Sequence, residues 1–96
     1  MRIPVTPVVW KQPGEARVVT FDFASKLNTG DTVTAIASLL APGLTVTAQL
    51  RTGNKVSALL AGGTIDETHR VNCRVTTTQG ETLELDVDVE VLDGAN

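Results

Sequence analysis

Residue types that could do chemistry are few in this sequence and lie far apart along it. It contains one histidine, His69, and one cysteine, Cys73, and none of its serines lies in a G-x-S-x-G motif. His69 could bind a metal or act as a general base, but a metal site needs three or four ligands and no second histidine is present. The pair Gly62-Gly63 lacks the lysine of a phosphate-binding loop. The sequence therefore predicts no catalytic residue, no metal site and no cofactor.

A row of acidic residues near the C-terminus could in principle bind calcium. The acids alternate with apolar residues and are Glu84, Asp86, Asp88 and Glu90. On a β-strand such residues stand about 7 Å apart along one face, whereas calcium ligands must converge on one point. We therefore interpret them as a solvated strand face. Cys73 faces inward by the same alternation, and we interpret it as a small core residue rather than a reactive thiol.

Two strands of a β-hairpin must position these residues. In the second strand Leu83, Leu85, Val87, Val89 and Val91 share one face, and in the first strand His69, Val71, Cys73 and Val75 do so. For both apolar faces to meet one core, the loop must hold three residues or a bulge, with Gly80 at positive φ. Arg70 and Arg74 then lie opposite Glu90 and Asp86, or opposite Asp88 and Glu84 if the register shifts by two. Either way each arginine faces a carboxylate.

The rest of the chain also resembles short strands separated by turns. Residues 17–23 alternate, with Val19, Phe21 and Phe23 on one face. Turn-forming residues at 28–31, 42–43, 52–54 and 62–63 then recur about every ten residues, which is typical of an all-β sandwich or barrel. The strands expected between them are residues 32–40, 44–50 and 56–61. The core is predicted to contain Val19, Phe21, Phe23, Val71, Cys73, Val75, Leu85, Val87 and Val89.

Three segments leave alternatives open. Residues 32–40 fit a helix capped by Asp31 as well as they fit a strand, and we prefer a strand because both neighbours are strands. A short helical turn is allowed at residues 24–27. Residues 1–11, with two prolines, are expected to form an extended arm or an edge strand. Within this arm, Trp10 either covers the end of the sandwich as core, which we prefer, or projects as an interface residue.

Composition limits the classes of function. Ninety-six residues suit one domain spanning 1–96, with residues 94–96 as a short tail. The chain is 42% hydrophobic and 20% charged, as in folded globular domains, and its net charge of −3 argues against a nucleic-acid partner. A single cysteine forms no internal disulfide. No apolar run is long enough for a signal peptide core or a membrane helix, and the initial methionine favours a free-standing gene product.

A loose pattern of turns and core positions resembles a family of small immunoglobulin-like (Ig-like) proteins encoded by tailed bacteriophages and prophages. The pattern comprises residues 10–15, Asp22-Phe23 with Leu27, residues 30–33, Gly62-Gly63 and the hairpin tip at 76–81. The resemblance implies an Ig-like antiparallel β-sandwich of about seven strands. It also implies that Phe23 replaces a usual tryptophan. His69 likewise replaces the tyrosine whose polar tip bonds nearby backbone at the corner of such folds.

The resemblance implies a non-enzymatic virion protein of the head, neck or tail, present in the bacterial cytoplasm during assembly. Its expected partners are other phage structural proteins or further copies of itself, with a host surface glycan as another candidate ligand and no nucleic acid or membrane. The alternative is a bacterial Ig-like adhesion or carbohydrate-binding module. Candidate interface residues are Trp10, Lys11, Asn28, Asp31, Asn54 and Lys55.

Overall fold

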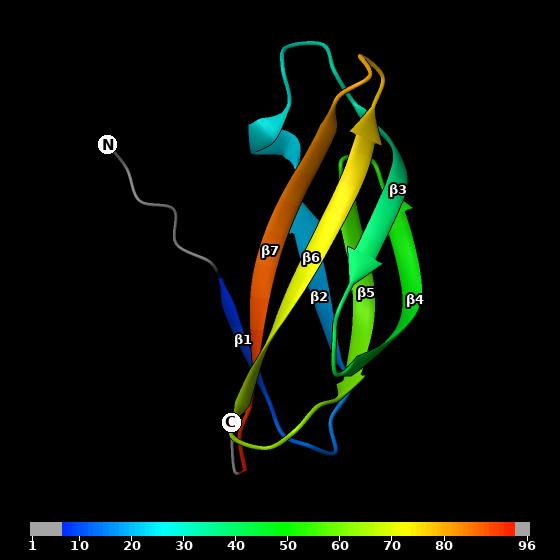
Figure 1. Ribbon diagram of the computed structural model, residues 1–96. Helices are drawn as coiled ribbons and strands as arrows, with labels where there is room; N and C mark the ends of the chain where they lie inside the picture. Colours follow the sequence, from blue (N-terminus) through cyan, green and yellow to red (C-terminus); the bar gives the residue numbers. More distant parts are fainter. Residues whose placement is uncertain (1–6, 94–96) are drawn as a thin grey trace, which may run out of the picture.

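The computed structural model describes residues 7–93 and is built almost entirely of β-strands (Figure 1). The seven strands of this part of the chain are β1 (Val8–Lys11), β2 (Arg17–Asp22), β3 (Val33–Leu40), β4 (Leu44–Thr52), β5 (Lys55–Gly62), β6 (Glu67–Thr77) and β7 (Thr82–Val91). A short 3-10 helix, η1 (Ala24–Lys26), follows β2 at the position where a helical turn was allowed. Residues 1–6 of the expected arm and the expected tail at 94–96 lie outside the described residues. No described helix is long and apolar enough to span a membrane.

The strands form two sheets that pack face to face, so the predicted β-sandwich is confirmed. One sheet has the order β1-β7-β6-β3 and the other has the order β2-β5-β4. Figure 1 shows β1 at the left of the sandwich and β3 and β4 at the right, with β2 behind β6. One pairing departs from the expected antiparallel arrangement, because β1 runs parallel to β7 at the edge of its sheet. The N-terminal segment thus contributes an edge strand, where proline at its start costs no ladder hydrogen bond.

The core lies between the two sheets and is formed by the inward rows that alternation predicts. Buried residues from the expected set are Val19, Phe21, Phe23, Val71, Cys73, Val75, Val87 and Val89, and Leu85 is half-buried against them. Central strand β5 adds Val56, Ala58 and Leu60. These three were not expected, because the alternation of β5 is masked by apolar residues on its outer face as well.

The β6–β7 hairpin adopts the shifted one of the two registers that the sequence allows. Its loop holds three residues, since the Thr77 N–H donates to the carbonyl of Glu81 and Gly80 lies at φ +86°. Arg74 lies opposite Glu84 and Arg70 opposite Asp88. Each arginine contacts its acid, at 2.9 Å and 2.8 Å respectively.

Residues 32–40 are a strand and not a helix. β3 pairs with β6, but its register shifts between Val33 and Ala35 and again between Ile36 and Ser38. These bulges interrupt the two-residue period, so Val33, Ile36 and Leu39 contact the core at intervals of three. An interval of three is also the spacing of a helix face, which explains why the sequence pattern was ambiguous here.

Candidate interaction surface

Trp10 lies on the outer face of the four-stranded sheet, so the prediction that it belongs to the core is wrong. The residue is 55% exposed, and its indole N–H donates to Glu90 Oε2 over 2.7 Å. Trp10 is opposite Glu90 in the parallel ladder, so both side chains share the outer face. Val8, two residues earlier, is on the same face and is 46% exposed. An aromatic ring and an aliphatic side chain therefore project together from the edge of the sheet.

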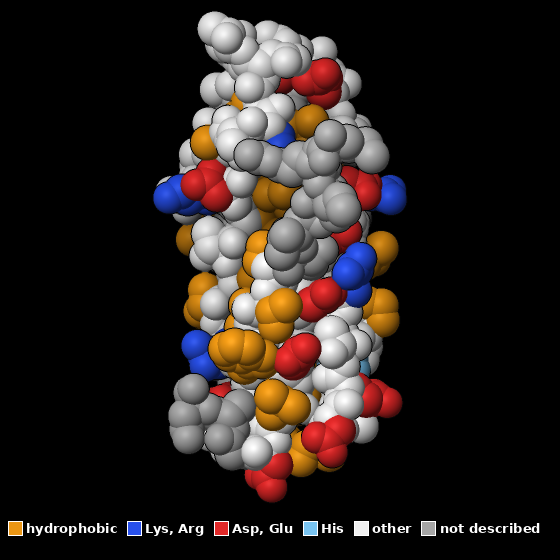
Figure 2. Space-filling model, turned by 90° about the vertical axis from the view of Figure 1, so that its left-hand side faces the viewer, with side chains coloured by type: hydrophobic (Ala, Val, Ile, Leu, Met, Phe, Trp, Pro, Cys, Tyr) orange, Lys and Arg blue, Asp and Glu red, His pale blue; other side chains and the backbone are white. Residues whose placement is uncertain are grey.

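A hollow lies beside this edge strand. Its volume is about 270 Å³, and it is lined by Val8, Val9 and Trp10 of β1 and by Arg17 at the start of β2. Figure 2 shows this side of the molecule, where hydrophobic side chains gather at the height of β1. The side chain of Arg17 forms no ion pair or hydrogen bond with the part of the chain that the structure describes. The hollow therefore combines an apolar lining with one uncompensated cation.

Lys11 was expected at an interface, but it is fully buried. Its Nζ donates to the carbonyls of Gln12 and Gly62 over 2.8 Å and 2.6 Å. Gly62 ends β5, so this ammonium joins the edge of one sheet to the other sheet. A buried ammonium must be hydrogen-bonded to offset its lost hydration, and the two carbonyls provide those bonds. Lys11 therefore stabilises the sandwich and offers no side-chain atom to a partner.

The loop at residues 28–31 is bound to the tip of the β6–β7 hairpin. Asn28 Nδ2 donates to Glu81 Oε1 over 2.9 Å, and the N–H groups of Thr32 and Gln79 donate to Asp31 Oδ1. Burial acts to raise the pKa of Asp31, but the hydrogen bonds it accepts outweigh this, so its pKa lies below the ordinary value. Asp31 is only 5% exposed. The expectation that Asp31 contacts a partner is therefore corrected, whereas Asn28 remains exposed.

Asn54 lies in the turn between β4 and β5, and Lys55 is the first residue of β5. The Asn54 side chain accepts the N–H of Val33 through Oδ1, over 3.0 Å, and its carbonyl accepts the N–H of Phe23. Lys55 is exposed, with its Nζ 4.0 Å from Asp22 Oδ2. Asn54 thus connects the two sheets at this end, and Lys55 is the more accessible of the two.

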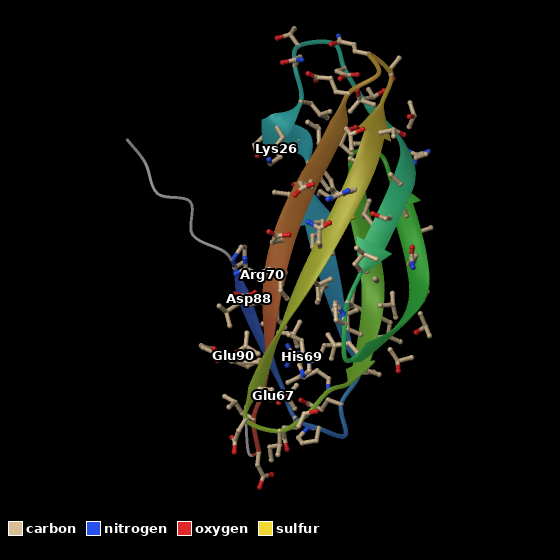
Figure 3. The ribbon with its side chains drawn as sticks, viewed as in Figure 1. Lys26, Glu67, His69, Arg70, Asp88 and Glu90 are labelled. Atoms are coloured by element: carbon tan, nitrogen blue, oxygen red, sulfur yellow. The ribbon has the colours of Figure 1, made fainter. Side chains whose placement is uncertain are left out.

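The acidic row of β7 is paired across the strands. Arg70 donates to both carboxylate oxygens of Asp88, over 2.8 Å and 3.1 Å, and these side chains lie together in Figure 3. This hydrogen bond from Arg70 lowers the pKa of Asp88. Asn72 donates to Asp86 over 2.7 Å. Among the described residues, no group of three or more His, Cys, Asp or Glu side chains could hold a metal ion.

His69, labelled in Figure 3, is held by hydrogen bonds to backbone groups. Its Nε2 accepts the Thr64 N–H over 3.2 Å, so its Nδ1 carries the proton and donates to the Pro42 carbonyl, 3.1 Å away. The backbone of Gly43 packs against the ring, where a Cβ would lie 2.7 Å from Nδ1 and Cε1. Both ring nitrogens are used in connecting two loops, which fits a structural role and leaves neither for catalysis.

Cys73 lies in the middle of β6 and is fully buried. Desolvation raises the pKa of its thiol to about 11. A thiol reacts through its thiolate, so this environment makes Cys73 a core residue and not a nucleophile.

A sequence comparison identifies the family of this chain. The model of the family described as podophage GP4 fiber-tail adaptor protein gp77 matches residues 11–90. The chain belongs to this gp77 family. It is therefore a structural or accessory protein of a phage tail, associated with the virion, and the expected phage origin is confirmed. Among curated proteins, none matches the chain.

The gp77 match and the exposed hollow share only Arg17. The matched span begins at Lys11 and includes Arg17, whereas Val8, Val9 and Trp10 precede it. Of the hollow's lining, only Trp10 is a candidate interface residue by sequence. Arg17 was missed because a single arginine at a strand start carries no pattern, and its lack of a partner is visible only in three dimensions.

Proposed function

We propose that the protein joins a fiber to the tail of a podophage virion through protein–protein contacts, without catalysis. The gp77 family match carries this proposal. The two side chains best suited to catalysis also support it. Both ring nitrogens of His69 are hydrogen-bonded to backbone groups, and Cys73 is buried. An adaptor needs a stable scaffold with exposed contact residues. A sandwich with one exposed aromatic at its edge meets this need.

The contact surface that we infer is the outer edge of β1. Tryptophan is among the residues most enriched at energetically dominant interface positions, and Trp10 is the sole tryptophan of the chain. Its hydrogen bond to Glu90 fixes the ring before any partner arrives. Less side-chain freedom is then lost on binding. Asn28, Asn54 and Lys55 stay candidates for a second contact at the opposite end.

We infer further that the domain is of the Ig-like type. Its three-stranded sheet β2-β5-β4 and the run β3-β6-β7 correspond to the B-E-D and C-F-G groupings of immunoglobulin sandwiches. The first strand differs from the constant-type arrangement, since β1 pairs with the last strand. The two backbone contacts of His69 support a role like that of the corner tyrosine.

Deletion of the gene from its phage tests the adaptor function. Virions assembled without the protein should retain tails but lack fibers, and mass spectrometry of wild-type virions should detect the protein together with both. Cross-linking in intact virions should join it to a fiber component and to a tail component. The proposal fails if the expressed protein is consistently missing from purified virions, or if deletion leaves the fibers in place.

A further inference from the structure

The free edge of β1 exposes unpaired backbone groups. The Pro7 carbonyl accepts the Asp88 N–H and the Lys11 carbonyl accepts the Leu92 N–H, so odd-numbered residues of this strand are turned toward β7. Backbone groups alternate in direction along a strand. The N–H and carbonyl groups of Val8 and Trp10 therefore point away from β7, and no described strand lies beside them. Such an edge can pair with another extended chain.

The turn after β1 limits this edge to a short stretch. The Gln12 N–H donates to Glu15 Oε1, and the Gln12 carbonyl accepts the Glu15 N–H. Pairing beyond Trp10 in this direction is therefore blocked. Within the described residues the edge offers two donors and two acceptors, from Val8 and Trp10.

Among the edge strands, β1 is favoured by its regularity and its surroundings. Both β3 and β4 carry bulges, and irregular edges of this kind hinder pairing with other chains. β2 is regular, but three of the four residues that line the hollow belong to β1. The fourth, Arg17, faces β1 from the start of β2.

Side chains around this edge define the chemistry of an added strand. Residues on one face of such a strand would contact Val8 and Trp10, which are apolar and exposed. Residues on the other face would enter the hollow beside Val9 and Arg17. The guanidinium of Arg17 has no partner among the described residues. A carboxylate of the added strand that enters the hollow would therefore complement its charge.

We propose that an extended segment of the virion component held by this adaptor adds to β1 as a fifth strand of the four-stranded sheet. The segment carries apolar side chains toward Val8 and Trp10, and an Asp or Glu side chain toward Arg17. Main-chain hydrogen bonds supply the affinity of strand addition, and alternate side chains supply its specificity. The inference rests on the proposed adaptor function and specifies how one of the two contacts is made.

Amide hydrogen exchange at single-residue resolution tests the strand addition. Two probes are mixed with the full chain in turn: the purified fiber protein of the same phage, and purified tails from a mutant that lacks fibers. With one of them, the amides of Val8 and Trp10 should exchange at least about tenfold more slowly, since they gain hydrogen bonds. The amides of Val9 and Lys11, already bonded to β7, serve as the internal control.

Two matched pairs of variants separate backbone pairing from side-chain contact. Val8→Pro removes the outward N–H and should weaken binding at least about tenfold, whereas Val8→Thr keeps that N–H and the branched shape. Arg17→Glu should weaken binding to a similar extent, and Arg17→Lys should retain most of it. Urea unfolding confirms that each variant is folded.

The outcomes distinguish failure of this inference from failure of the proposed function. If a probe binds but the amides of Val8 and Trp10 exchange at the rate of the free protein, strand addition at β1 is wrong and the adaptor function stands. Equal binding by Val8→Pro and Val8→Thr would overturn the inference in the same way. If neither probe binds the wild-type chain, the adaptor function itself fails.

Discussion

The indole N–H of Trp10 donates to the carboxylate of Glu90 over 2.7 Å, while more than half of the tryptophan remains exposed. The two residues lie opposite each other in the only parallel pairing among the described strands. The ring is thus oriented by β7 without being buried by it. A partner that covers the ring gains its apolar area and loses little side-chain entropy.

Replacement of Trp10 should separate binding from stability. Trp10→Ala should change the free energy of unfolding by less than about 1 kcal/mol, because the side chain is largely exposed. It should weaken binding to the fiber or tail component at least about tenfold, as expected of a central interface tryptophan. Urea unfolding followed by circular dichroism and a binding titration measure the two effects. Val18→Ala, an exposed position on the other sheet, is the control, and equal binding losses in both variants would exclude Trp10 as the anchor.

The inward row of β2 should dominate the stability of the sandwich. Phe21 is 2% exposed, and Phe21→Ala should cost about 3–5 kcal/mol through lost burial and the cavity that remains. Thr20 faces solvent on the same strand, and Thr20→Ala should cost less than about 0.5 kcal/mol. Urea melts of the two variants measure the difference. Similar midpoints would mean that the strand is turned the other way.

The fold could be predicted from the sequence wherever alternation is uninterrupted. In β2, β6 and β7 the two-residue period determines the buried face, because each strand has one core face and one solvated face. The hairpin register could be narrowed only to two possibilities, since both bring arginines to carboxylates. The contact between Arg70 and Asp88 identifies the register that forms. In β3 the bulges removed the period on which the prediction depended.

The candidate site could be predicted only in part, because it depends on which side chains of β1 face the core. The residues Val8, Val9, Trp10 and Lys11 show no clear alternation, and hydrophobicity alone favours a buried tryptophan and an exposed lysine. The structure has the reverse, with Lys11 buried and Trp10 exposed. The lysine can be buried because its ammonium donates hydrogen bonds to the carbonyls of Gln12 and Gly62, and one of those carbonyls lies 51 residues away. No local pattern reports such a distant acceptor.

Cys73 should react with thiol reagents only when the domain opens. Its thiol is fully buried, and its pKa is raised to about 11 by desolvation. Labelling with a chromogenic disulfide at pH 8 should therefore be slow in the native protein and fast in urea. A Thr20→Cys variant, which adds an exposed thiol, gives the fast reference rate. Native labelling of Cys73 at that reference rate would contradict its position in the core.

Protonation of Asp31 should account for part of the loss of folding stability in acid. Its pKa is lowered from the ordinary value of 3.8 in the folded protein, so the unfolded chain binds a proton more readily. The stability that the carboxylate contributes is therefore complete above about pH 4 and is lost as the pH falls through its folded-state pKa. Asp31→Asn should be less stable than wild type at pH 7 and should lose less stability between pH 4 and pH 2. Urea midpoints across this range test the effect, with Asp93→Asn as the control, and parallel curves for Asp31→Asn and wild type would exclude it.

Two glycines with nearly the same positive φ should differ in their tolerance of alanine. Gly43 has φ +83° and Gly80 has φ +86°, so alanine at either position should cost about 1–2 kcal/mol of backbone strain. A Cβ at Gly80 meets no atom within 4 Å, whereas one at Gly43 lies 2.7 Å from the ring of His69. That ring cannot retreat without losing its bonds to Pro42 and Thr64. Gly43→Ala should therefore destabilise the protein clearly more than Gly80→Ala in urea melts. Replacing His69 with alanine in the Gly43→Ala background should remove most of that excess, and equal costs for the two glycine variants would show that the His69 corner is not closely packed.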